Sequence, residues 1–348
     1  MHLKHILCGL LLYVGSAGLM LAQAIELNPD HPDRYEVVKD DTLWDISSKF
    51  LSNPWLWPEI WHVNPAIENP HLIYPGDIIS LGFVDGKPVL SLERGRATVK
   101  LSPNKRTTAI DQAIPTIPVS IIKQFLIRPR VLNKEEIDSA AYIVASEDNR
   151  LVSGAGSKLY ARQLDTSNDD LFSLYHIGDA YVDPSAKNKK DAILGYEAIH
   201  VADLKLVKEG DPSTLLITHS KREALKGDLV LPREDSSYDQ NFIPRPPKAD
   251  VQGQIIHVVD GVSRIGQYQI VVLNIGIEAG IEAGHVLTIS QSGAVVRDVF
   301  KGNEKVTLPS EEVGTLMVFR PYEKVSYALI MKALRDIRLY DTVSTPES

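Results

Sequence analysis

The hydrophobic pattern changes character at about residue 119, which divides the chain into two kinds of structure. Between residues 35 and 82, apolar positions first alternate and then recur at helical spacing. From 119 onward the apolar runs are short, rich in β-branched residues and separated by Gly, Asp, Asn and Pro, as is typical of strands and turns. Four such runs lie at 142–145, 215–218, 270–273 and 286–289. We therefore predict an α+β chain, in which a small βααβ module is followed by a mainly antiparallel β region.

Local signals give the first half of the small module. Residues 35–38 alternate as a half-buried strand. Thr42 is a good helix N-cap, and Asp45 three residues later can complete a capping box. The apolar residues that share one face of the predicted helix are Leu43, Ile46 and Phe50.

The second half of the module is predicted in the same way. A second helix can begin near Trp55 or Pro58, since proline is favoured in a first turn, and residues 64–65 (Asn-Pro) end it. Residues 75–76 (Pro-Gly) suit a type II turn, and residues 77–81 form the closing strand. The predicted order is strand, helix, helix, strand.

The first residues have the pattern of a secretory signal peptide. Lys4 precedes an apolar stretch over residues 6–22, and residues 22–24 (Ala-Gln-Ala) have the small-x-small pattern of a cleavage site. We expect cleavage after Ala24 and export to the periplasm or cell envelope, with no stable membrane span left. The alternative is that the stretch is kept as an N-terminal anchor. The only cysteine, Cys8, lies within it, so a cleaved chain would contain no disulfide, thiolate metal site or cysteine nucleophile.

Composition and charge narrow the classes of partner. The chain has 348 residues, of which 44% are hydrophobic and 24% charged, as in ordinary globular proteins of two or three domains. The formal net charge is -8 and no long basic run is present. The electrostatic pattern of a nucleic-acid partner is therefore missing.

Polar and proline-containing segments suggest the domain boundaries. The predicted divisions are a signal peptide at 1–24, a linker at 25–34, the module at 35–82, a linker with short strands at 83–118, a β-rich domain at 119–242, a Pro-rich linker at 243–250 and a second β-rich domain at 251–348. Residues within 196–232 also match residues within 253–290 at a constant offset of 57, without a gap, so that His200 coincides with His257. This self-similarity predicts a two-unit repeat; the alternative is chance similarity between β-rich segments.

The module resembles the LysM family at both of its ends. That family begins with a valine followed by glycine-aspartate-threonine-leucine-tryptophan, and residues 38–46 here read VKDDTLWDI. It ends on asparagine-proline-x-leucine-isoleucine-x-proline-glycine, and residues 69–77 read NPHLIYPGD. Two features depart from the family. Asp40 replaces the usual glycine, although aspartate tolerates a left-handed backbone better than most residues, and residues 52–59 are longer and more aromatic than the minimal form.

The resemblance implies a binding function. LysM modules bind N-acetylglucosamine polymers, in bacteria chiefly peptidoglycan, in a groove between the first loop and the loop before the last strand. Carried over by position, the implied glycan-binding residues are Asp40, Asp41, Thr42, Leu43, Asn69, Pro70, His71, Leu72 and Ile73. Backbone groups of two loops can hydrogen-bond N-acetyl groups, and small apolar side chains can cover the sugar.

Core packing is the competing interpretation for the apolar residues of the module. It applies to Leu43 and Ile73, and we prefer it for Ile46. We also expect core packing, rather than sugar stacking, for the four tryptophans, because a domain this small needs large aromatic side chains to bury enough surface. These tryptophans are Trp44, Trp55, Trp57 and Trp61.

The sequence shows no recognisable catalytic constellation. The histidines are scattered, and neither the H-E-x-x-H spacing of zinc peptidases nor a G-x-S-x-G nucleophile elbow is present. Residues 154–158 are glycine-rich but lack phosphate-loop spacing, so a turn before a strand is the better interpretation. A carboxylate pair for glycoside cleavage stays open, because its spacing is spatial. We expect no enzyme, no cofactor and no metal site.

Together these patterns favour a non-catalytic envelope protein. Its module would hold the glycan strands of peptidoglycan, and residues 119–348 would contact a protein partner in the envelope. The alternatives are a wall hydrolase with an unrecognised active site in the β-rich half, and a structural component of an envelope complex.

Overall fold

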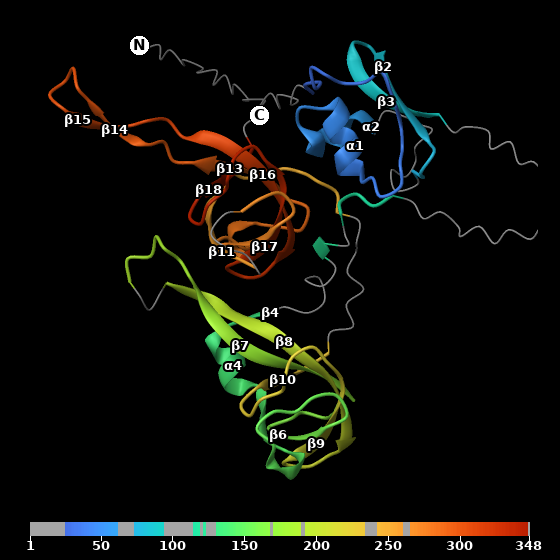
Figure 1. The fold of residues 1–348 in the computed structure, drawn as a ribbon, viewed down its shortest axis with the longest axis vertical. Helices are drawn as coiled ribbons and strands as arrows, with labels where there is room; N and C mark the ends of the chain where they lie inside the picture. The colour runs from blue at the N-terminus through green and yellow to red at the C-terminus, as the bar shows by residue number, and fades with distance from the viewer. Residues whose placement is uncertain are drawn as a thin grey trace, which may run out of the picture.

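The structure is a computed structural model, and its described part falls into three units that contact one another (Figure 1). The described residues are 25–61, 73–93, 114–118, 121–122, 130–167, 170–188, 192–233, 242–259 and 265–346. The predicted signal peptide, residues 1–24, lies outside them. None of the helices in these ranges combines the length and apolar character that a bilayer crossing requires.

The N-terminal unit consists of helices packed on a three-stranded antiparallel sheet of order β1-β2-β3. Its elements are β1 (Arg34–Glu36), α1 (Leu43–Phe50), the 3-10 helix η1 (Pro54–Leu56), α2 (Trp57–Trp61), β2 (Ile78–Val84) and β3 (Lys87–Glu93). The predicted strand, helix, helix, strand order is confirmed. The third strand, β3, lies within the expected linker 83–118. It pairs with β2 because Asp85 (φ 49°) and Gly86 (φ 76°) form a tight hairpin turn between them.

The core of this unit contains all four tryptophans, and none of them is more than 5% exposed. Trp57 and Trp61 meet edge to face, with ring centroids 5.3 Å apart. The helical face predicted from the sequence, made of Leu43, Ile46 and Phe50, is fully buried. The tryptophans are therefore core residues, and sugar stacking has no exposed indole ring to use.

Residues 25–34 pack against this unit, so they are part of it rather than the predicted linker. The backbone N–H of Asn28 donates to the carbonyl of Phe50 (2.9 Å), and its side-chain amide donates to the carbonyl of Ser48 (3.1 Å). The N–H of Ser52 donates to the carbonyl of Glu26 (3.0 Å). The first two bonds satisfy carbonyl groups that the end of α1 leaves without helical partners. A polar, proline-containing sequence indicates irregular backbone here, but it does not show what that backbone contacts.

The second unit is a ring of six antiparallel strands. Its elements are β4 (Arg130–Leu132), α4 (Lys134–Ser139), β5 (Ala141–Ser146), the 3-10 helix η2 (Glu147–Asn149), β6 (Lys158–Arg162), β7 (Leu171–Val182), β8 (Ile193–Lys208), β9 (Ser213–Ser220) and β10 (Leu229–Pro232). Pairing runs β8-β7-β10-β5-β6-β9, and β9 pairs again with β8, so the six strands close on themselves. The remaining strand, β4, pairs with β8 from outside the ring.

The third unit is a closed barrel of order β11-β12-β17-β16-β13-β18. Its elements are β11 (Gln252–Val258), β12 (Ile270–Leu273), the 3-10 helix η3 (Ile277–Ala279), β13 (Val286–Gln291), β14 (Val295–Asp298), β15 (Glu304–Thr307), β16 (Glu311–Pro321), β17 (Ser326–Ala333) and β18 (Thr342–Ser344). The hairpin β14–β15 projects from the barrel, as Figure 1 shows at the upper left. The strands predicted at 142–145, 215–218, 270–273 and 286–289 are all present.

The two rings repeat the same topology, which supports the predicted two-unit repeat. In chain order, the six strands of the first ring correspond to β11, β12, β13, β16, β17 and β18, and both rings then have the same strand order. The same turn recurs before each last strand. Asp228 Oδ2 accepts from the N–H of Leu225, and Asp341 Oδ2 accepts from the N–H of Arg338, both at 2.8 Å.

The alignment of residues 196–232 with 253–290 is nevertheless wrong. It pairs β8 with β11, which occupy different places in the strand order. His200, buried on β8, and His257, on β11, are therefore not equivalent. The correct correspondence is hidden because the hairpin β14–β15 interrupts the second copy, and because Gly227 (φ 91°) in the recurring turn is replaced by Tyr340 (φ 70°).

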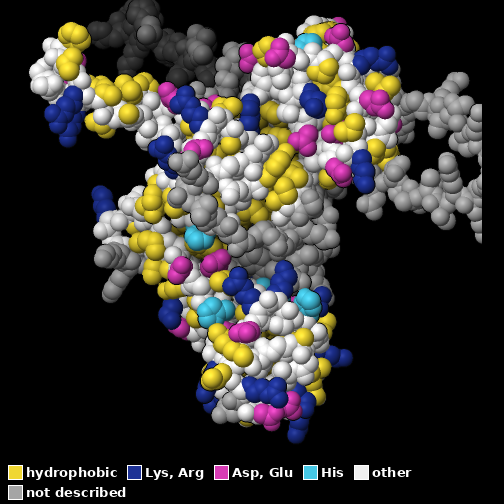
Figure 2. All heavy atoms as spheres, viewed as in Figure 1, with side chains coloured by type: hydrophobic (Ala, Val, Ile, Leu, Met, Phe, Trp, Pro, Cys, Tyr) yellow, Lys and Arg dark blue, Asp and Glu magenta, His cyan; other side chains and the backbone are white. Residues whose placement is uncertain are grey.

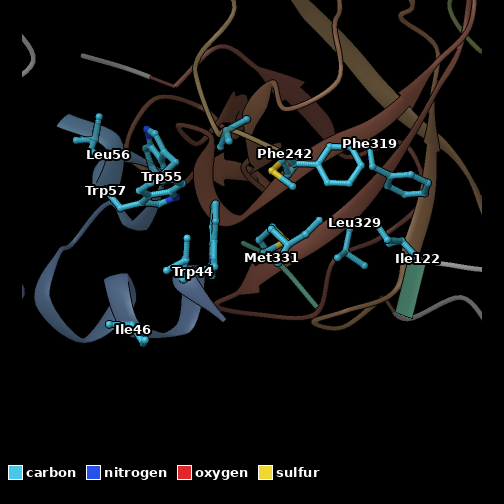
Figure 3. Packing of buried hydrophobic residues seen from close by; sticks show 14 of the residues in the cluster. Trp44, Ile46, Trp55, Leu56, Trp57, Ile122, Phe242, Phe319, Leu329 and Met331 are labelled. Atoms are coloured by element: carbon cyan, nitrogen blue, oxygen red, sulfur yellow. The ribbon is translucent and has the colours of Figure 1, made fainter. Parts of the chain in front are cut away.

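The outer face of the barrel packs against the N-terminal unit. One continuous apolar cluster contains Trp44 together with Phe319, Leu329 and Met331 of the barrel strands (Figure 3). The hydroxyl of Tyr268 also donates to Asp45 Oδ1 (2.9 Å) across this seam. The N-terminal unit is therefore held on the barrel by apolar packing and by a hydrogen bond to a charged group.

Candidate functional site

The loop between β1 and α1 is built around the carboxylate of Asp41. Its Oδ2 accepts from the backbone N–H of Val38 (2.9 Å) and from the hydroxyl of Tyr35 (3.0 Å). Burial, followed by the hydrogen bond to Asp41, raises the pKa of Tyr35 to about 12. Asp40 lies at the turn with φ 73°, which is the left-handed conformation that a glycine would also adopt. Replacement of the family's glycine by aspartate therefore leaves the turn intact.

A reciprocal capping box closes this loop, as the sequence predicted. Thr42 Oγ1 accepts from the N–H of Asp45 (3.1 Å) and donates to Asp45 Oδ2 (2.7 Å). The backbone N–H of Thr42 also donates to Asp45 Oδ2 (3.3 Å). Thr42 is 3% exposed, so its hydroxyl positions the start of α1 and is not available to a ligand.

The loop before β2 is described from Ile73 onward. The other predicted site residues of this loop, Asn69, Pro70, His71 and Leu72, lie outside the described part of the chain. The N–H of Tyr74 donates to Asp77 Oδ2 and the N–H of Asp77 to the carbonyl of Tyr74, both at 3.0 Å. Gly76 takes φ 91°, as the predicted type II turn requires. Its N–H donates to the carbonyl of Val37 (2.7 Å), which ties this loop to the end of β1.

A backbone segment from later in the chain, residues 114–118, bridges the two loops. The N–H of Ile114 donates to the carbonyl of Ile73 in the second loop (2.8 Å). The N–H groups of Leu43 and Trp44, at the start of α1, donate to the carbonyls of Pro115 (2.9 Å) and Thr116 (3.0 Å). The two predicted loops therefore lie close enough to bind one extended segment between them.

The backbone segment 114–118 lies between the two loops, and we call the place that it fills the cleft. The predicted site residues contribute to this cleft in different ways. The side chains of Leu43 and Ile73 are fully buried, so core packing is their role and only their backbone groups reach the cleft. Asp40 is exposed at the loop, and Asp41 shapes it from within. Sequence reasoning missed the bridging segment, whose only signal was a pair of prolines, Pro115 and Pro118, with Thr116 and Ile117 between them.

A cavity of about 440 Å³ lies at the seam between the N-terminal unit and the barrel. Its lining is mostly polar and includes Asn28, Asp45, Ser48, Gln267 and Lys332. Burial, the nearby charge of Asp45 and the hydrogen bond to it raise the pKa of Tyr268, beside Gln267, to about 12. Trp44, whose backbone N–H donates to the carbonyl of Thr116, also lines this cavity, so the cavity lies beside the start of α1.

Comparison with protein-family models shows which kind of domain the N-terminal unit contains. Residues 35–82 match the model of the LysM domain. The chain contains a LysM domain. This supports a carbohydrate-binding module of the kind that binds peptidoglycan. The match lies within the N-terminal unit and includes none of the two rings, and a search among curated proteins found no match to the chain.

The histidines that form hydrogen bonds in the rings do so at strands and turns. His176 Nδ1 lies 2.9 Å from Asp228 Oδ1, in the recurring turn, and His200 Nε2 lies 3.0 Å from Asp203 Oδ1 on the same strand. His285 Nδ1 lies 3.1 Å from the N–H of Glu282, and burial lowers the pKa of His285. Among the described residues, no group of three or more His, Cys, Asp or Glu side chains is placed to hold a metal ion.

Proposed function

We propose that this protein is a non-catalytic envelope protein, which binds the glycan strands of peptidoglycan through its LysM domain and anchors the two β rings at the cell wall. The observation that carries the proposal is the LysM match over residues 35–82, together with a first loop that keeps its turn despite Asp40. The signal-peptide pattern in residues 1–24 supports export to the periplasm or cell envelope.

The chemistry of the cleft suits an acetylated amino-sugar. An acetamido group carries one N–H donor and one carbonyl acceptor and has no charge. The polar groups of the cleft are the N–H groups of Leu43 and Trp44 and the carbonyl of Ile73, all from the backbone, and in the structure residues 114–118 bond to them. Backbone groups at the start of a helix bind carbonyl oxygens without needing a charged side chain. Recognition through them therefore suits a neutral repeating polymer.

The projecting hairpin supports a second part of the proposal, a protein partner for the β-rich region. Val299 and Phe300 at its turn are 71% and 95% exposed, and Val295, next to its base, is 63% exposed. Hydrophobic side chains gather along this projection in Figure 2. Exposed apolar residues on a protruding element are typical of interaction sites. We propose that this hairpin contacts an envelope protein while the LysM domain holds the wall.

Retention on purified sacculi, followed by assay for released muropeptides, tests the proposal with the full exported chain. We expect retention without release. Asp41→Ala removes the acceptor for the Val38 N–H and the Tyr35 hydroxyl, so it should open the first loop and weaken retention. Asp30→Ala removes the same charge from an exposed position outside the loop and is the matched control. Release of muropeptides would instead favour a wall hydrolase.

A further inference from the structure

The segment of residues 114–118 satisfies the backbone groups that we assign to glycan binding. It accepts from the N–H groups of Leu43 and Trp44 and donates one N–H to the carbonyl of Ile73, at 2.8 to 3.0 Å. All three bonds have the short lengths of well-formed N–H···O bonds. The two N–H donors cannot serve a ligand while the segment stays in place, and the segment then also lies against the carbonyl of Ile73.

The low exposure of its side chains shows that the segment is packed into the structure and does not lie on the surface. Ile114, Thr116 and Ile117 are 4%, 1% and 0% exposed, whereas Pro115 is exposed. Ile114 and Ile117 belong to the same apolar cluster as Trp44 and the outer barrel residues. The segment is thus anchored by two isoleucines, and its hydrogen bonds are made by its backbone.

The segment presents the same chemical groups as the proposed ligand. A peptide offers an N–H donor and carbonyl acceptors, and so does a chain of acetamido groups. The segment's carbonyls take up the donors at the start of α1, where the acetamido carbonyl of a sugar would bind, and its N–H takes up the acceptor in the second loop. A peptide strand and an acetylated glycan are therefore alternative occupants of one cleft.

We infer that residues 114–118 are a built-in occupant of the LysM cleft, which peptidoglycan must displace in order to bind. The inference rests on the proposed function, because it assigns the same backbone groups to the sugar. The chain alternates between a closed form, with the segment in the cleft, and an open form that accepts glycan. The apparent affinity for glycan is then reduced by the fraction of molecules that are open.

The experiment compares two single substitutions in the full chain. Ile117→Asp places a charge at a fully buried anchor and should release the segment. Leu151→Asp places the same charge at an apolar side chain that is 91% exposed on the first ring, outside the segment, and is the matched control. The probe is the tetramer of N-acetylglucosamine, titrated by calorimetry. We expect Ile117→Asp to bind it about tenfold or more tightly than the wild type, because removal of the closed form raises the open fraction. Leu151→Asp should bind like the wild type.

Amide hydrogen exchange on the wild-type chain provides a second test that needs no substitution. Addition of the tetramer should speed exchange at Ile114, whose N–H is bonded to Ile73 only in the closed form. The amides of Leu43 and Trp44 should stay protected, because the sugar replaces the segment as their acceptor. This measurement decides the question if Ile117→Asp does not fold.

The outcomes separate the two proposals. Equal affinity of the wild type and folded Ile117→Asp would overturn the occlusion and leave glycan binding intact. Absence of binding by both would overturn the proposed function, and the occlusion with it. Unchanged exchange at Ile114, with sugar-dependent protection at Ser48 and Gln267 instead, would move the binding site to the seam cavity and refute the inference.

Discussion

Replacement of Thr42 tests whether the capping box holds the first loop of the LysM domain. Thr42→Val keeps the shape of the side chain and removes only the hydroxyl. The N–H of Asp45 then loses its acceptor at 3.1 Å, and the Asp45 carboxylate loses a donor at 2.7 Å. Thr42→Ser is the matched comparison, because it keeps the hydroxyl and removes only the methyl group.

The expected free energies follow from these contacts. Loss of a side-chain N-cap costs about 1 kcal/mol. The lost hydrogen bond to a carboxylate brings the total for Thr42→Val to about 2 kcal/mol of unfolding free energy. Thr42→Ser removes one buried methyl group from a site that is 3% exposed, which costs about 0.8 kcal/mol. Valine should therefore destabilise the domain more than serine does.

Tryptophan fluorescence during urea unfolding measures this difference within the LysM domain. All four tryptophans of the chain lie in that domain, so their emission reports its unfolding. If Thr42→Ser lowers the unfolding free energy as much as Thr42→Val does, or more, the hydroxyl of Thr42 has no capping role.

Three further substitutions test other parts of the account. Asp40→Gly should change the unfolding free energy by less than about 1 kcal/mol, because two effects oppose each other. Glycine relieves the strain of the left-handed backbone at this position, but it also increases the conformational entropy of the unfolded chain. A larger change in unfolding free energy, measured by urea unfolding, would contradict this. Tyr268→Phe should cost about 1.5 kcal/mol by removing the hydrogen bond to Asp45. The pKa of Tyr268 in the folded chain is about 12, above the ordinary 10.0. The contribution of protonated Tyr268 to the stability of the fold is therefore complete below pH 10 and is lost as the pH rises from 10 to 12. In urea unfolding, Tyr268→Phe should not show the part of the loss of unfolding free energy between pH 10 and 12 that comes from ionisation of Tyr268. The same pH profile of unfolding free energy in this variant and in the wild type would contradict this contribution. Phe300→Ser, at a side chain 95% exposed, should leave unfolding unchanged within about 0.5 kcal/mol but weaken chemical cross-linking to an envelope partner; unaltered cross-linking would exclude Phe300 from the contact.

Local signals in the sequence predicted the LysM domain well, because its chemistry is local. The capping box of Thr42 and Asp45 and the turn at Gly76 each depend on residues within one turn of the chain. The buried face of α1 follows from helical spacing, and burial of the tryptophans follows from the small size of the domain. Tolerance of a left-handed backbone at Asp40 is a property of the residue itself.

Features that depend on contacts between distant residues were not predicted. Backbone groups make the hydrogen bonds of residues 114–118 to Leu43 and Ile73, and of Asn28 to Phe50. Every residue type carries such groups. Sequence therefore gives no sign of them. The repeat was detected but misaligned, because short β-branched runs resemble one another and only strand pairing shows which of them are equivalent.

Saturation-transfer NMR on the tetramer of N-acetylglucosamine, with the folded full chain, measures whether the LysM cleft binds acetylated amino-sugars. We expect transfer to the acetyl methyl protons, stronger with Ile117→Asp than with the wild type and weak with Asp41→Ala. Absence of transfer from both the wild type and folded Ile117→Asp would contradict this binding.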